Sequence, residues 1–314
     1  MTLDAQTLSD MFAEIRSTDL RVADVGALKE RIGSAIGGMR MNGPFCEPGI
    51  TVYRGAKLLE REKPALRDRL SYPPDHLANG WGRVTRPGQR VFYCSVPRDA
   101  VGFELGLNAG DHVAIGRWRS TAPLMFTQVG FHPGVLHNLG GARAAALRVS
   151  NPTAPLSDLD RQIDAFFSEQ FCKIVGPGDE HLYKISVAIA EPLFRAGFEF
   201  RDVPGYTGAP RVAGLLFPSI ATLGNNDNIA FLTEVVDDSL TLEFVEWSRV
   251  ESVAHERITL TPVDCASSFG PRGEIEWLGR QPRLLVPPGG RHTWAPDGTV
   301  IEAFDAAGRR IERS

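Results

Sequence analysis

Residues 157–176 read SDLDRQIDAFFSEQFCKIVG and predict an amphipathic helix. Ser157, followed three residues later by Asp160, forms a capping-box pattern, in which two side chains satisfy main-chain N–H groups at a helix start. Gly176 suits the C-terminal end of such a helix. The apolar stripe at helical spacing consists of Leu159, Ile163, Phe166 and Phe167.

A second helix follows, and short β-favouring runs flank the pair. This helix is predicted over residues 180–196, with a kink at Pro192 and an end at Gly197. Strands are expected at residues 50–53, 91–94, 214–217, 229–232 and 240–247. Because strands precede and follow the helix pair without a regular strand–helix alternation, the sequence predicts an α+β fold rather than a doubly wound sheet.

The two ends of the chain differ in character from its middle. Apolar residues at helical spacing behind Asp4 predict helices near the N-terminus, and a run of glycines marks the boundary after them. The last part of the chain is typical of β-hairpins, with a turn at residues 296–298. We expect a helical segment at residues 1–45, a core at 46–254 and a β-rich extension at 255–314.

Charge and hydropathy exclude several classes of protein. The chain has 314 residues, 34 of them basic and 38 acidic, for a net charge of −4. This balance supplies no long-range attraction to nucleic acid or to anionic lipid. Residues 1–6 lack the basic start of a secretory signal, and no apolar run approaches the roughly 18 residues that cross a bilayer. We therefore expect a cytoplasmic protein with neither a membrane nor a nucleic acid as partner.

Common metal and nucleotide motifs are missing from the sequence. The four cysteines lie far apart, without a CxxC pair, which predicts reduced thiols and no metal site. Residues 80–82 read GWG without a third glycine, and no P-loop, GxSxG or HExxH is found. The cysteines are Cys46, Cys94, Cys172 and Cys265.

Three segments carry polar residues in an ordered pattern. Residues 51–55 read TVYRG, a short strand with Arg54 near its end. Residues 82–88 read GRVTRPG, and they are followed by a strand with Tyr93 and by Glu104. The third segment contains Phe-Pro-Ser at residues 217–219 and an asparagine-rich run after it.

Together these segments resemble the RES domain family, which is named for its Arg, Glu and Ser. The matching region runs from residue 50 to residue 250, although family members usually carry GRWNPPG where this chain has GRVTRPG. Members are bacterial toxins that are usually paired with an antitoxin. Their fold is similar to that of ADP-ribosyltransferases of the diphtheria-toxin type, so the resemblance implies an ADP-ribosyltransferase-like split β-sandwich core.

The resemblance implies an enzyme that cleaves the nicotinamide–ribose bond of NAD. Breaking this bond leaves positive charge on the ribose, which a carboxylate stabilises, and this role falls to Glu104. A planar guanidinium is the natural partner of the pyrophosphate, and Arg54 and Arg83 are the candidates. Ser219 would orient Arg54 or a ribose hydroxyl.

Further residues would frame the NAD site. Tyr53 and Tyr93 would stack on the nicotinamide, and Asn228 would steady the loop that carries Ser219. The catalytic group is thus expected to be Arg54, Glu104 and Ser219, with no metal and no cofactor beyond NAD as substrate.

Three functions stay open at this point. NAD is degraded by glycohydrolysis if water attacks the ribose, or by phosphorolysis if phosphate does. An ADP-ribosyltransferase would pass the ADP-ribose to a protein or nucleic acid with the same core chemistry. A non-catalytic NAD-binding or interaction module on the same fold is the third. The resemblance also implies an antitoxin protein as partner and assembly into a homo-oligomer.

Overall fold

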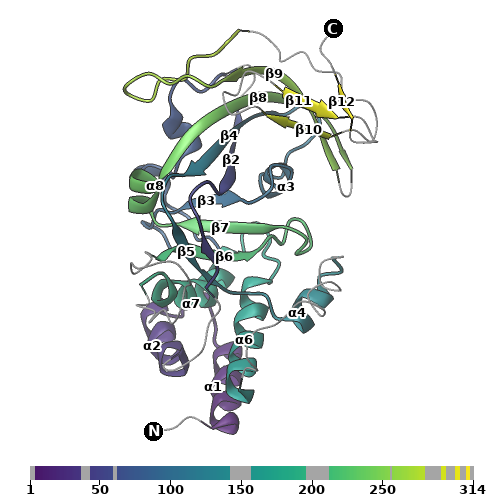
Figure 1. The fold of residues 1–314 in the computed structure, drawn as a ribbon. Helices are drawn as coiled ribbons and strands as arrows, with labels where there is room; N and C mark the ends of the chain where they lie inside the picture. Colours follow the sequence, from purple (N-terminus) through teal and green to yellow (C-terminus); the bar gives the residue numbers. More distant parts are fainter. Residues whose placement is uncertain are drawn as a thin grey trace. The chain divides into compact units, whose positions relative to one another are not determined.

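The chain forms two compact units, which we call unit 1 and unit 2 (Figure 1). A computed structural model describes residues 4–36, 43–58, 62–141, 157–195, 212–254, 257–279, 291–294, 301–304 and 309–311. Unit 1 is made of Met1–Ile50, Tyr72–Val96 and Ser120–Ser239. Unit 2 is made of Thr51–Ser71, Pro97–Arg119 and Leu240–Ser314. Helices and mostly antiparallel strands are mixed, which confirms the predicted α+β class.

Unit 1 contains strands that lie in the order β1-β5-β6-β7-β3. The β5–β6 pair is parallel, and the other pairs in this series are antiparallel. Their bounds are β1 Phe45–Cys46, β3 Phe92–Ser95, β5 Leu124–Gln128, β6 Val212–Pro218 and β7 Asp227–Phe231. The middle strands are rich in buried aromatic and branched side chains, which suits strands covered on both faces.

Helices α1, α2, α6 and α7 pack on one side of this sheet (Figure 1). Their buried apolar faces form one core together with Leu215, Phe217 and Ala230 of β6 and β7. Among the described residues, the helices of unit 1 are α1 Ala5–Ser17, α2 Val25–Ile36, α4 Pro133–Asn138, α6 Asp158–Phe171, α7 Lys184–Arg195 and α8 Thr233–Ser239, with 3-10 turns η2 Asp75–Leu77 and η3 Glu180–Tyr183. The helices predicted near the N-terminus therefore contribute to the core of unit 1.

The helix pair at the centre of the sequence forms as expected, with two differences. The capping box is present, because Ser157 Oγ accepts from the Asp160 N–H while the Asp160 carboxylate accepts from the Ser157 N–H. Helix α6 ends at Phe171, before Gly176, and the second helix begins as η3 and continues as α7. Pro192 lies inside α7, whereas Gly197 lies outside the described residues.

Unit 2 contains strands that lie in the order β2-β4-β8-β9. Strand β2 pairs antiparallel with β4, and β8 pairs antiparallel with β9. The short helix α3 packs against this sheet through an apolar cluster formed by α3, the segment after it, β4 and β8. The bounds are β2 Thr51–Leu58, η1 Arg67–Leu70, α3 Ala100–Glu104, β4 His112–Ser120, β8 Leu240–Ala254 and β9 Arg257–Ala266.

The C-terminal part adds a second, smaller sheet of antiparallel strands in the order β10-β11-β12. These are β10 Arg291–Trp294, β11 Ile301–Phe304 and β12 Arg310–Ile311. The turn predicted at residues 296–298 lies outside the described residues. The boundary expected between residues 254 and 255 falls in the connection of the β8–β9 hairpin, because β8 continues to Ala254.

All four cysteines are free, as expected from their spacing, and all but the half-buried Cys46 are buried. Burial raises the pKa of the Cys172 thiol to about 11, which keeps that side chain protonated at neutral pH. In the described residues no helix is long and apolar enough to cross a membrane. The same part of the chain holds no group of three or more His, Cys, Asp or Glu side chains suited to a metal ion.

Helix α1 is attached to the core by an aromatic stack, which provides a test of the unit 1 packing. The rings of Phe12 and Phe166 lie 4.0 Å apart between centroids and are nearly parallel. Replacement Phe12→Ala removes this contact and leaves a cavity, so we expect the free energy of unfolding to fall by about 3–5 kcal/mol in urea denaturation. Val22→Ala is the control, because Val22 is 81% exposed and its truncation should change stability little.

Candidate functional site

The residues selected from the sequence are divided between the two units. Unit 1 holds Arg83, Tyr93, Ser219 and Asn228. Unit 2 holds Tyr53, Arg54 and Glu104.

Tyr93 and Asn228 meet in unit 1, although 135 positions separate them in the sequence. The Asn228 Nδ2 group donates to the Tyr93 hydroxyl over 2.8 Å. Ser95, which sequence reasoning missed, donates its hydroxyl to Asn228 Oδ1 over 3.0 Å. The register of β3 and β7 places Ser95 opposite Asn228. We call these three side chains, with Ser219 at the neighbouring end of β6, the Tyr93 cluster.

Ser219 lies fully buried directly after the last residue of β6. Its N–H donates to the Asn226 carbonyl, and its own carbonyl accepts from the Gly224 N–H, each over 2.8 Å. Leu223 in this loop has φ 54°, a left-handed conformation that is unfavourable for a branched side chain. The loop between β6 and β7 is therefore held in one specific shape around Ser219.

The strands that carry the Tyr93 cluster are fixed by aromatic packing. Phe217 lies opposite Asn228 in the β6–β7 pair, so the two side chains project from the same face. The ring of Phe217 contacts the ring of Tyr93, with centroids 5.6 Å apart. The polar end of the tyrosine thus meets the asparagine while its ring belongs to the apolar core.

Arg83 makes contacts of a different kind. Its Nη1 group donates to the main-chain carbonyls of Phe171 and Lys173 at the C-terminal end of α6. Its guanidinium also lies 5.3 Å from the ring centroid of Tyr183. A cation at the C-terminal end of a helix satisfies carbonyls that have no partner within the helix. The structure therefore gives Arg83 a helix-capping contact that the sequence did not predict.

Tyr53 and Arg54 project from opposite faces of β2, because successive side chains of a strand alternate. Arg54 donates its Nε–H to the Ser71 carbonyl over 2.7 Å. Tyr53 lies across from Arg117 of β4 and packs against the apolar cluster beneath α3. Burial raises the pKa of the Tyr53 hydroxyl, and the guanidinium of Arg117 acts in the opposite direction.

Helix α3, which carries Glu104 at its end, packs on the Tyr53 face of β2. A Cβ atom at Gly55 would lie 2.4 Å from Val101 Cγ1 and 2.8 Å from Leu105 Cδ1, so the glycine permits this close approach. The Arg54 side chain projects from the opposite face of β2. Within unit 2, the sheet therefore separates the Arg54 side chain from the helix that carries Glu104.

A buried charged network in unit 2 was not predicted from the sequence. Arg98, just before α3, forms an ion pair with Glu246 of β8, and Ser248 donates its hydroxyl to the same carboxylate. The Glu246 side chain is only 3% exposed. Arg98 and Glu246 line a small cavity of about 10 Å³ together with Tyr53 and Arg117. The available signal was an acidic residue, Glu246, between the apolar residues Val245 and Trp247.

The Tyr93 cluster can be tested by removing one hydroxyl. Tyr93→Phe deprives the buried Asn228 amide of its 2.8 Å partner, so we expect the free energy of unfolding to fall by about 1–3 kcal/mol. The matched control is Tyr72→Phe. The Tyr72 hydroxyl donates to the exposed Asp237 carboxylate, so its removal should lower the free energy of unfolding by less. Equal losses in the two variants would contradict a special role for the buried bond.

The charged network makes a separate prediction for stability. Arg98→Met leaves the Glu246 carboxylate buried without its cation, so we expect a loss of about 3–5 kcal/mol in urea denaturation at neutral pH. The double variant Arg98→Met with Glu246→Leu should regain most of this loss, because it removes the uncompensated charge. A double variant no more stable than Arg98→Met would show that the pair itself supplies the stability.

Comparisons with known proteins identify no relative. A scan against protein-family models finds no match, and searches of curated proteins and of solved structures find none.

Proposed function

We propose that this protein cleaves the nicotinamide–ribose bond of NAD, on an ADP-ribosyltransferase-like core. The observation that carries the proposal is the Tyr93 cluster, in which Tyr93 and Asn228, both selected from the RES-like pattern, share a hydrogen bond beside the buried Ser219. A satisfied and buried polar network fixes side chains in one geometry, which a substrate site requires. The enzyme would act in the cytoplasm, where NAD is available.

Cleavage of the nicotinamide–ribose bond requires a different contribution from each residue. As the bond between ribose C1′ and the nicotinamide nitrogen breaks, its electron pair leaves with nicotinamide and positive charge develops on the ribose. Glu104 would stabilise this charge, and a guanidinium such as Arg54 would hold the pyrophosphate. Water then forms the new bond to C1′ and gives up one proton to the solvent, whereas phosphate forms this bond through an oxygen that is already deprotonated.

A second candidate, a non-catalytic NAD-binding or interaction module, is favoured by two observations. Arg83 Nη1 already donates hydrogen bonds to two main-chain carbonyls at the end of α6, and these bonds compete with binding of a pyrophosphate. Arg54 and the helix of Glu104 lie on opposite faces of β2. Such a module would bind NAD without releasing nicotinamide.

The deciding experiment incubates the purified full chain with NAD, with and without phosphate, and follows nicotinamide release by chromatography. We expect Glu104→Gln, which keeps the size of the side chain and removes its charge, to lower the rate by at least about 100-fold. Arg54→Lys should lower the rate about tenfold, because a lysine cannot form a bidentate contact. The matched controls are Glu251→Gln and Arg69→Lys, since both residues are exposed in unit 2.

Each outcome selects one function. Nicotinamide release that Glu104→Gln removes and Glu251→Gln retains supports NAD cleavage, and dependence on phosphate identifies phosphorolysis. In a further arm, NAD labelled in its adenylate part is incubated with the protein and a cell lysate. Label that stays on protein or nucleic acid of the lysate identifies transfer of ADP-ribose. Stoichiometric NAD binding without release in any arm overturns the enzymatic proposal and favours the binding module.

A further inference from the structure

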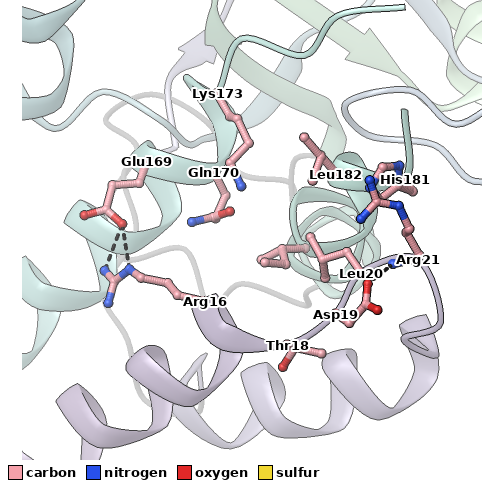
Figure 2. A pocket seen from close by; sticks show the side chains of 11 residues that line it. Arg16, Thr18, Asp19, Leu20, Arg21, Glu169, Gln170, Lys173, His181 and Leu182 are labelled. Carbon is pink, nitrogen blue, oxygen red and sulfur yellow. Dashed lines mark hydrogen bonds and ion pairs between the residues drawn. The ribbon is translucent and has the colours of Figure 1, made fainter. Parts of the chain in front are cut away.

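A pocket of about 470 Å³ lies in unit 1 and shares no lining residue with the Tyr93 cluster (Figure 2). Its walls come from the end of α1 and the segment after it, the last turn of α6, η3 and the start of α7. This volume falls within the range of sites that enclose small molecules. None of its lining residues belongs to the pattern from which the NAD-cleaving function was inferred.

Gln170 is the first observation that points to a ligand. Its side chain is 6% exposed and lines the pocket. Figure 2 shows its amide directed into the central space rather than into the helical core. No hydrogen bond joins this amide to another group in the part of the chain that the structure describes. The amide atoms are open to the pocket rather than sealed in the core, so an oxygen or N–H of a bound ligand can pair with them directly.

The charges around the pocket indicate which kind of group fits. Glu169 is neutralised by Arg16, which donates both Nε–H and Nη2–H to the same carboxylate oxygen over 3.1 and 2.8 Å. Lys173 and Arg21 also line the pocket, and neither forms a side-chain ion pair within the described residues. Asp19, the other lining carboxylate, accepts the main-chain N–H of Arg21 over 3.0 Å.

Lys173 adds a second, independent argument. Its ammonium group projects toward the same space as the Gln170 amide (Figure 2). Burial lowers the pKa of Lys173 below its ordinary value, which reflects the loss of water around a charge that Glu169 only partly offsets. An anion placed beside this ammonium would restore the lost stabilisation.

We propose that this pocket is a binding site for a small organic anion. The phosphate or carboxylate group of the ligand contacts Lys173 and Arg21, and the Gln170 amide hydrogen-bonds to an adjacent oxygen or N–H. Asp19 on the same walls disfavours a long polyanion such as a nucleic acid, because its carboxylate would repel the chain of phosphates. The limited volume of the pocket, about 470 Å³, also favours a compact ligand.

The test measures binding of inorganic phosphate and of citrate to the full chain by isothermal titration calorimetry, at constant ionic strength set with chloride. Gln170→Glu keeps the shape of the side chain but places a negative charge in the pocket, and Lys173→Gln removes the cation. We expect each variant to weaken binding at least about tenfold. The matched control is Arg161→Gln, because Arg161 is an exposed cation at the other end of α6, where it pairs with Asp158.

Binding that both pocket variants weaken and Arg161→Gln retains supports the proposal, and the stronger of the two probes identifies the preferred anionic group. Circular dichroism and thermal unfolding establish that each variant is folded. Absence of binding by the wild-type chain, or binding that all three variants weaken equally, overturns the proposal. NAD cleavage is measured separately, and its presence or absence has no bearing on this outcome.

Discussion

The packing of α6 on the sheet of unit 1 is the contact on which the other features of that unit depend. Phe166 stacks on Phe12 and so attaches α1, while Phe171 meets Phe217 of β6 edge to face with centroids 5.7 Å apart. Phe217 in turn contacts the ring of Tyr93. Through α6, which carries both Phe166 and Phe171, these ring contacts connect the N-terminal helix to the Tyr93 cluster. Because interiors are close-packed, a displacement of α6 would move both ends of this connection.

Local patterns in the sequence predicted the elements that such packing requires. The capping box before α6 and the strands of residues 214–217 and 229–232 were found because their signals lie within a few neighbouring residues. Strand β4 was missed, since HVAIGRWRS places Gly116 and two arginines among its apolar residues and shows no clean alternation. Its Arg117 is nearly buried, which local propensity does not reveal.

The candidate site was predictable only in part, because its contacts join distant segments. Tyr93 and Asn228 were selected through the ordered pattern, and their hydrogen bond follows from β3 and β7 being neighbours. No such pattern marked the pair of Arg98 and Glu246, which are 148 positions apart. Arg83 shows the converse, since its residue type fitted a phosphate while the fold directs its Nη1 group to helix carbonyls. Residue type restricts the chemistry, and only the pairing of elements decides the partner.

The last turn of α6 and the two residues after it contact two neighbouring features. The carbonyls of Phe171 and Lys173 accept hydrogen bonds from Arg83, while the side chain of Lys173 faces the proposed anion pocket. An anion at Lys173 could influence the segment of Arg83 only if it bound more tightly to one position of this turn than to another. Because Phe166 and Phe171 of α6 are fully buried in the core, the end of this helix has little freedom to shift. The packing therefore favours a pocket that stabilises α6 in place over one that switches it.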